Sequence, residues 1–179
     1  LAECEQRLST LTDPPESRLG IARVLLHSAR MSAYFRRGDL PSGAAAGELA
    51  DRQFRATVPD HSNRLGEYKL EWADVLYRLD DAAAAREMWL DISNRRGDDG
   101  LLPEQGEARL RLAWLAHHEA YGEEREAAAG HAHTARRIFT RFGRVERLAQ
   151  ADALIAALDG GGPLPAFEEL TAGCDYPAY

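Results

Sequence analysis

Several features that the sequence lacks restrict the possible fold and function of this chain. It has no uninterrupted apolar stretch of the roughly 18 residues that a membrane-spanning helix needs. It has no sustained alternation of β-branched and polar residues, which argues against strands and predicts an all-α fold. Its only cysteines, Cys4 and Cys174, lack the spacing of a metal site. Two reduced thiols in a helical protein favour a cytoplasmic location.

An excess of positive charge is also missing. The chain has 22 Lys and Arg against 29 Asp and Glu, a formal net charge of −7. A protein that binds duplexes without sequence preference needs a positive surface to release counterions, so we expect no direct nucleic-acid binding. The sequence opens with neither an initiator Met nor a signal peptide, and we interpret it as a fragment of a longer protein, with processing of a smaller precursor as the alternative.

What is present is a recurring unit of a helix, a tight polar turn and an alanine-rich helix. Its turns centre on Gly38, Asp80 and Gly122, which are separated by two equal intervals of 42 residues. Trp72 and Trp114 each precede a turn by eight residues. A recurrence of this length without strands predicts stacked antiparallel helical hairpins.

Capping residues and apolar periodicity set the expected helix bounds. Asp13 and Pro14 begin a first helix that extends to about Arg37. We expect further helices at about 42–56, 63–79, 82–94, 104–121, 124–142 and 145–158, the last as a C-terminal capping helix. Residues 1–158 are therefore interpreted as one repeat domain. Glycines and Pro163 then end helical structure, and residues 159–179 are expected to be a tail of turn and poorly fixed coil.

These features resemble the tetratricopeptide repeat (TPR). With Asp80 at the family's turn position, its small and large apolar positions fall on Trp72, Ala73, Leu76, Ala85 and Trp89. The resemblance implies a TPR-like α-solenoid of antiparallel helical hairpins over about residues 18–158. Residues 132–143 are also similar in style to the helical repeats of large bacterial transcriptional activators and signalling ATPases. That similarity implies a regulatory module of a larger bacterial protein.

The resemblance further implies a concave binding groove lined by the first helix of each hairpin. Transferred residue by residue, the groove positions are Ser32, Phe35, Arg36, Leu70, Asp74, Tyr77, Arg78, Leu112, Ala116 and Glu119. Phe35 and Tyr77 would be aromatic anchors, while Arg36 and Arg78 would orient a carboxylate. The implied function is a non-catalytic module that binds a protein, a peptide or a neighbouring domain. An alternative left open is that the repeats only pack against the rest of their own parent protein.

Two other function classes have candidate residues. A small-molecule sensor could enclose its ligand near Trp72, Trp89 and Trp114, although tryptophans beside leucines at helical spacing are typical of packing. A metal-dependent enzyme could use a His/Glu cluster made of His117, His118, Glu119, Glu123, Glu124, His131 and His133. Consecutive helical residues diverge by about 100°, so we expect no shared metal, no cofactor and no catalytic residue there.

A local basic region is the last candidate. It consists of Arg136, Arg137, Arg141, Arg144 and Arg147. Such a patch could contact phosphate or an acidic protein face. We interpret the region as a solvated helix face that balances the acidic remainder of the chain.

Overall fold

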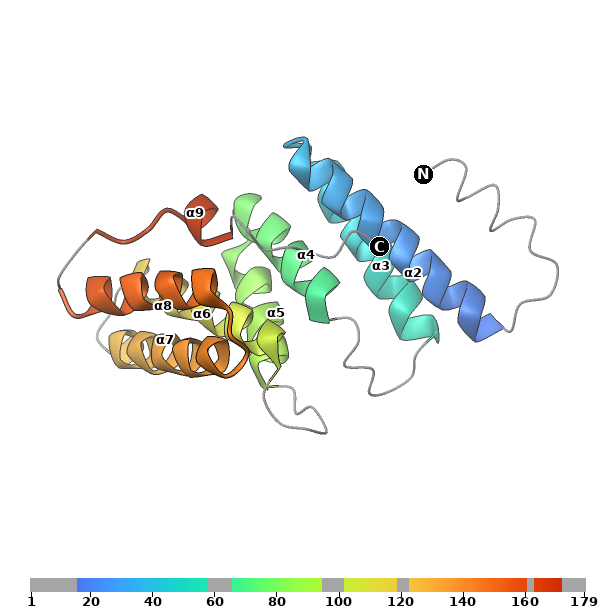
Figure 1. The fold of residues 1–179 in the computed structure, drawn as a ribbon. Helices are drawn as coiled ribbons and strands as arrows, with labels where there is room; N and C mark the ends of the chain where they lie inside the picture. The colour runs from blue at the N-terminus through green and yellow to red at the C-terminus, as the bar shows by residue number, and fades with distance from the viewer. Residues whose placement is uncertain (1–15, 58–65, 95–101, 119–122, 161–162, 172–179) are drawn as a thin grey trace. The chain divides into compact units, whose positions relative to one another are not determined.

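The computed structural model describes residues 16–57, 66–94, 102–118, 123–160 and 163–171 (Figure 1). Every regular element in these ranges is a helix, which confirms the all-α prediction for this part of the chain. None of the described helices is both long and apolar enough to cross a membrane. The described residues form two compact units, one up to Ala85 and the other from Arg86 onwards.

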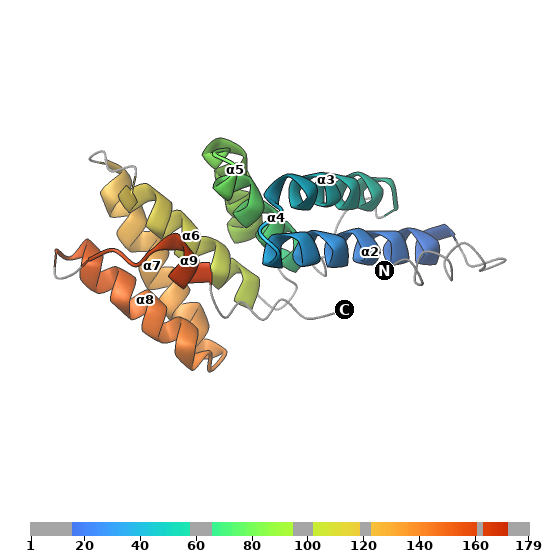
Figure 2. The same cartoon turned by 90° about the horizontal axis from the view of Figure 1, so that it is seen from above.

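The first unit contains α2 (Glu16–Arg36), α3 (Leu40–Thr57), α4 (Gly66–Arg78) and the first turn of α5 (Ala82–Asn94). Helices α2 and α3 lie side by side, as both views show (Figures 1 and 2). Our prediction that α3 begins at Ser42 is wrong by two residues. Asp39 caps the helix by accepting a hydrogen bond from the Ser42 backbone N–H at 3.3 Å, which places Pro41 in the first turn, where no backbone donor is needed.

The predicted equivalence of the first two turns is confirmed. Gly38 (φ 74°) and Asp80 (φ 63°) both adopt the left-handed conformation just after a helix. In each turn the following aspartate, Asp39 or Asp81, donates its N–H to a carbonyl five residues earlier, as in a Schellman motif. The Asp81 side chain then caps α5 as Asp39 caps α3, accepting from Ala84 N–H at 3.1 Å. The third predicted turn, at Gly122, lies outside the described residues.

Small residues let the helices of the first unit approach closely. The buried face of α3 includes Gly43, Ala46, Gly47 and Ala50. The indole of Trp72 in α4 lies against Gly47, where an added Cβ would come within 2.4 Å of the ring. The spacing of these residues at i, i+3, i+4 and i+7 is that of one helix face, so the alanine-rich sequence encodes a packing surface.

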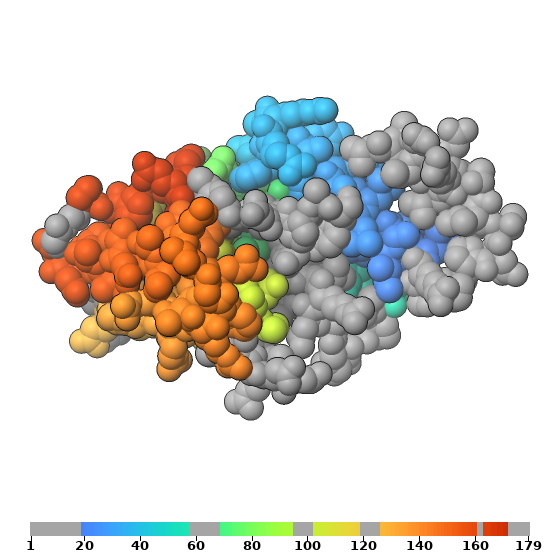
Figure 3. All heavy atoms as spheres, viewed as in Figure 1, coloured from blue at the N-terminus to red at the C-terminus, as the bar shows by residue number. Residues whose placement is uncertain are grey.

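The second unit contains the rest of α5, then α6 (Pro103–His118), α7 (Glu123–Arg141), α8 (Val145–Leu158) and α9 (Phe167–Thr171). Helix α7 packs against both α6 and α8. In Figure 3 the orange side chains of α7 and α8 form the face of this unit that is turned to the viewer. The bounds predicted for α5 and α8 match the structure.

Helix α9 corrects our expectation of coil after Asp159. Its Phe167 is buried, with ring centroids 6.0 Å from Trp89 and 5.2 Å from Trp114. Trp114 Nε1 also donates a hydrogen bond to the Pro165 carbonyl at 2.7 Å. The segment is therefore fixed by the aromatic core of the second unit and not by its own short helix.

A partly buried carboxylate links α6 to α8. Glu107 accepts from Arg111 Nη1 at 3.0 Å and from Arg147 Nε at 2.7 Å, and both arginine side chains are almost fully buried. Arg147 Nη1 also donates to the Leu170 carbonyl in α9 at 2.9 Å. Arg147 therefore does not belong to a solvated basic face, and that prediction is wrong for this residue. Arg136 of the same predicted region pairs with Asp152 at 2.6 Å on the surface.

Candidate functional site

The first candidate site is the surface where the ends of α2 and α4 meet. The guanidinium of Arg78 lies over the Phe35 ring, 4.7 Å from its centroid. Phe35 and Arg78 are partly exposed, and the neighbouring Arg36 is exposed. A cation–π contact of this kind fixes both side chains. We call Phe35, Arg36 and Arg78 the Phe35 surface; Tyr77, which is also partly exposed, is adjacent to Arg78 in the chain.

Two buried carboxyl groups lie behind this surface. Glu71 is only 3% exposed and accepts a hydrogen bond from Ser32 Oγ, while Asp74 is fully buried one turn later in α4. Burial raises the pKa of Glu71 from 4.5 to about 7, the Ser32 hydrogen bond and the Arg36 charge lower it, and the Asp74 charge raises it further. A carboxyl group with a pKa near neutrality is a frequent feature of functional sites, although buried structural networks also produce one.

The predicted groove residues therefore separate into accessible and interior positions. Ser32, Phe35, Tyr77, Arg78 and Ala116 are partly exposed, and Arg36 is exposed. Leu70, Asp74 and Leu112 are buried in the structure, so their side chains do not offer the binding contacts that the repeat alignment assigned to them. Glu119 lies outside the described residues. The structure brings Ser32, Phe35 and Arg36 of α2 close to α4: Ser32 bonds Glu71, Phe35 contacts Arg78, and the charge of Arg36 acts on Glu71.

The space proposed for a tryptophan-lined ligand site is filled in the second unit. Phe167 packs against both Trp89 and Trp114, and the His118 ring stacks on Trp114 at 4.8 Å. In the first unit, Trp72 covers Gly47. The Trp72 Nε1–H is buried without a hydrogen-bond partner among the described residues. These three indoles therefore act as packing residues.

The predicted His/Glu cluster is only partly described. Glu119 and the side chains of Glu123 and Glu124 fall outside the described residues. Within the part of the chain that the structure does describe, no group of three His, Cys, Asp or Glu side chains is arranged to hold a metal ion. His118 is engaged with Trp114, whereas His131 lines a cavity elsewhere in the second unit.

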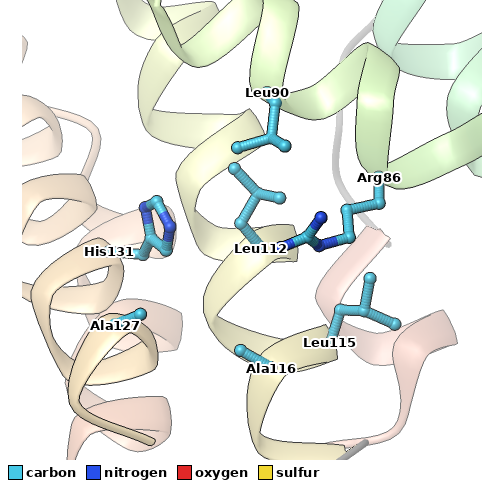
Figure 4. Close-up of a pocket in the computed structure, with 7 residues that line it drawn as sticks. All are labelled: Arg86, Leu90, Leu112, Leu115, Ala116, Ala127 and His131. Carbon is cyan, nitrogen blue, oxygen red and sulfur yellow. The ribbon is translucent and has the colours of Figure 1, made fainter. Parts of the chain in front are cut away.

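That cavity is the second candidate site. It has a volume of about 50 Å³, is partly open, and lies between α5, α6 and α7 (Figure 4). Its apolar wall is formed by Leu90, Leu112, Leu115, Ala116 and Ala127. Its two polar lining residues come from different helices: Arg86 reaches in from α5 and His131 projects from α7 (Figure 4). Leu112 and Ala116 were predicted as groove residues, and the structure places them in this cavity wall.

The charges that act on His131 at the cavity are those of arginines. Arg109 Nη1 lies 3.2 Å from His131 Nδ1, and Arg109 Nη2 donates to the Ser93 carbonyl at 3.2 Å. Burial lowers the pKa of His131, and the charges of Arg109 and Arg86 lower it further. Burial also lowers the pKa of Arg109, with a contribution from Arg137. Because arginine only donates, His131 Nδ1 is the acceptor and the neutral ring carries its proton on Nε2.

Sequence reasoning missed Glu71, Arg86 and Arg109. Glu71 follows the repeat position of Leu70, but nothing in the local sequence shows that α2 covers it. Arg86 and Arg109 belong to helices separated by a segment outside the described residues, so their common location depends on tertiary packing. The residue that could have pointed to this cavity is His131, which the sequence analysis named only as a member of the candidate metal cluster.

Comparison with known protein families, curated proteins and solved structures finds no match to this chain.

Proposed function

We propose that the chain is a non-catalytic module that binds an acidic segment of a protein or peptide, or of a neighbouring domain, through the Phe35 surface. The observation that carries the proposal is the placement of Arg78 over Phe35 at 4.7 Å beside the exposed Arg36. A fixed aromatic ring offers apolar contact at little cost in side-chain entropy. The guanidinium of the exposed Arg36 can bind a carboxylate through two parallel hydrogen bonds.

The wider assignment is a TPR-like α-solenoid with α8 as its capping helix. The recurrence of the same turn and cap at Gly38–Asp39 and at Asp80–Asp81 supports it, since equivalent turns produce equivalent hairpins. We also propose that the module belongs to a larger bacterial regulatory or signalling protein of the cytoplasm, on the resemblance given above. The net charge of −7 supports a partner other than nucleic acid.

Glu71 is a candidate for an enzymatic role, because its carboxyl group has a raised pKa. Its side chain is 3% exposed and bonded to Ser32, so a substrate could not reach it in this conformation. Catalysis by general acid or base needs hydrogen-bond contact with the reacting group. We therefore assign Glu71 to the support of the Phe35 surface: it bonds Ser32 and interacts with the charge of Arg36.

The proposal is tested by peptide selection. Random peptides displayed on phage are selected against the immobilised 179-residue chain, and enriched sequences are measured as synthetic peptides by fluorescence anisotropy. We expect enrichment of Asp or Glu next to an apolar residue. Arg36→Gln should weaken the binding of these peptides at least about fivefold, because it removes a charge-assisted hydrogen bond.

The matched control is Arg23→Gln, which removes an exposed arginine from the same helix. This variant should bind the selected peptides within about twofold of the original chain, as expected for a charge outside the contact. Selected peptides that bind equally well to Arg36→Gln, or a selection without acidic residues, would refute the Phe35 surface as the binding site.

A further inference from the structure

We propose that the cavity between α5, α6 and α7 binds a carboxylate group on a short aliphatic chain, with Arg86 and His131 contacting the carboxylate. This chemistry is shared by a free short-chain acid and by an Asp or Glu side chain of a peptide. The site belongs to the second unit and shares no residue with the Phe35 surface, so it goes beyond the function proposed above and can fail independently of it.

The size and lining of the cavity suit such a group. Its volume of about 50 Å³ exceeds the roughly 30 Å³ that one water molecule occupies in the liquid. It can therefore hold a few heavy atoms, and its open side leaves room for the rest of a larger ligand. Five of its seven lining residues are Leu or Ala, which favours aliphatic carbon over a fully polar anion such as phosphate.

The basic groups at the cavity are suited to pair with an anion. Arg86 and Arg137 have no hydrogen-bond or ion-pair partner among the described residues, and Arg109 is bonded only to the Ser93 carbonyl and to His131. The Arg109 Nε–H is buried and unbonded within the described structure. The charged groups that act on His131 are Arg86 from α5 and Arg109 from α6, and both are positive. A bound carboxylate would relieve this repulsion.

His131 supplies a direct readout. In the free protein, burial and the two arginines keep its pKa below 6.5, so the ring is neutral at neutral pH. A carboxylate beside the ring would favour the imidazolium form and raise that pKa. Linkage then requires binding to tighten as the pH falls from neutrality, over the range in which the ligand's own carboxyl group stays ionised.

The experiment is an NMR titration of the His131 ring signals in the full chain at constant ionic strength. The probes are propionate and N-acetylglutamate N′-methylamide, each paired with its neutral amide, propionamide or N-acetylglutamine N′-methylamide. We expect saturable shifts with the two carboxylates and not with the amides. Propionate binding alone would indicate a free acid as the ligand, whereas tighter binding of the glutamate derivative would indicate a peptide side chain.

Variants separate the site from general charge effects. Arg86→Met keeps the aliphatic length of an exposed side chain, so the fold should be retained, and it should weaken carboxylate binding at least about fivefold. The matched control, Arg144→Met, removes an exposed arginine beyond the other end of α7 and should leave binding within about twofold. Absence of saturable shifts, equal binding of the amides, binding of inorganic phosphate in place of propionate, or unchanged binding by Arg86→Met would each overturn the proposal.

Discussion

At the scale of single residues, Glu71 shows how burial changes an ordinary carboxyl group. Its pKa is 4.5 in an exposed chain and about 7 in the folded protein, chiefly because burial disfavours the charged form. The folded state therefore binds one more proton than the unfolded state between these pH values. Stability that is fully present below pH 4.5 is lost as the pH rises through about 7.

This difference predicts a pH-dependent free energy of unfolding. At about 1.4 kcal/mol per pH unit, the change from 4.5 to about 7 corresponds to a loss of about 3 kcal/mol. Glu71→Gln cannot ionise and should lack this component, which urea unfolding measured from about pH 4 to about pH 8 would show. The exposed Glu48→Gln is the control and should retain it. Parallel pH profiles for Glu71→Gln and the original chain would contradict the assignment.

Glu107 differs from Glu71 because its carboxylate is paired with two buried cations, Arg111 and Arg147. We predict that Glu107→Gln lowers the free energy of unfolding by about 3 kcal/mol, since Arg111 and Arg147 both lose a charged partner in the interior. Urea unfolding measures the change. Asp152→Asn breaks the exposed pair with Arg136 and should cost less than about 1 kcal/mol. Equal losses for the two variants would show that burial of the Glu107 network contributes nothing.

At the scale of secondary-structure elements, the close approach of α3 and α4 depends on Gly47. Alanine is the better helix former by about 1 kcal/mol, yet its Cβ would come within 2.4 Å of the Trp72 ring. We predict that Gly47→Ala is destabilising by about 1–2 kcal/mol because overpacking exceeds the gain in helix propensity.

Gly130 in α7 provides the matched control for that substitution. An added Cβ there meets no atom within 4 Å, so Gly130→Ala should be stabilising by about 0.5–1 kcal/mol. Thermal unfolding of both variants checks the sign of each effect. If Gly47→Ala also raised the unfolding temperature, the Trp72 contact would not be a tight one.

The elements also show what the sequence could predict. The turns at Gly38 and Asp80 were predicted because the residue type itself encodes a left-handed backbone. The bounds of α8 were predicted because Val145 and Asp159 enclose a continuous apolar pattern. Helix α9 was missed because five residues after a glycine-rich segment carry no periodic signal. Its position is set by Trp89 and Trp114, and contacts between distant residues are not local information.

The candidate sites also divide into features that local sequence predicts and features that depend on contacts between distant residues. Phe35, Arg36 and Arg78 could be named together because the 42-residue recurrence relates α2 to α4. The buried groove positions Leu70, Asp74 and Leu112 could not be distinguished from the accessible ones, since a repeat alignment assigns positions and not exposure. The cavity was invisible to sequence reasoning because it is formed by side chains from three helices.

At the scale of the whole molecule, the two compact units carry separate tryptophan reporters, with Trp72 in the first and Trp89 and Trp114 in the second. We predict that Phe167→Ala lowers the free energy of unfolding of the second unit by about 3–4 kcal/mol, because it leaves a cavity against both of that unit's indoles. The substitution should also shift the emission of these tryptophans, since it admits water to their rings.

Phe142→Ala is the control for this change, because Phe142 is 40% exposed and lies in the turn after α7. It should alter the unfolding free energy by less than about 1 kcal/mol. Urea unfolding followed by fluorescence and by hydrogen exchange checks both variants. A Phe167→Ala protein with unchanged protection in α6 and α8 would show that α9 is dispensable for the second unit.

The double role of Asp39 has a consequence for how this chain tolerates insertions and deletions. The same residue closes the end of α2 through its backbone and opens α3 through its side chain. One additional residue at this point would separate the two roles and turn every side chain of α3 by about 100° around its axis. The Gly43–Gly47 face would then point away from Trp72. The connection between α2 and α3 should therefore tolerate substitutions but not insertions or deletions, because its length sets which face of α3 packs against Trp72.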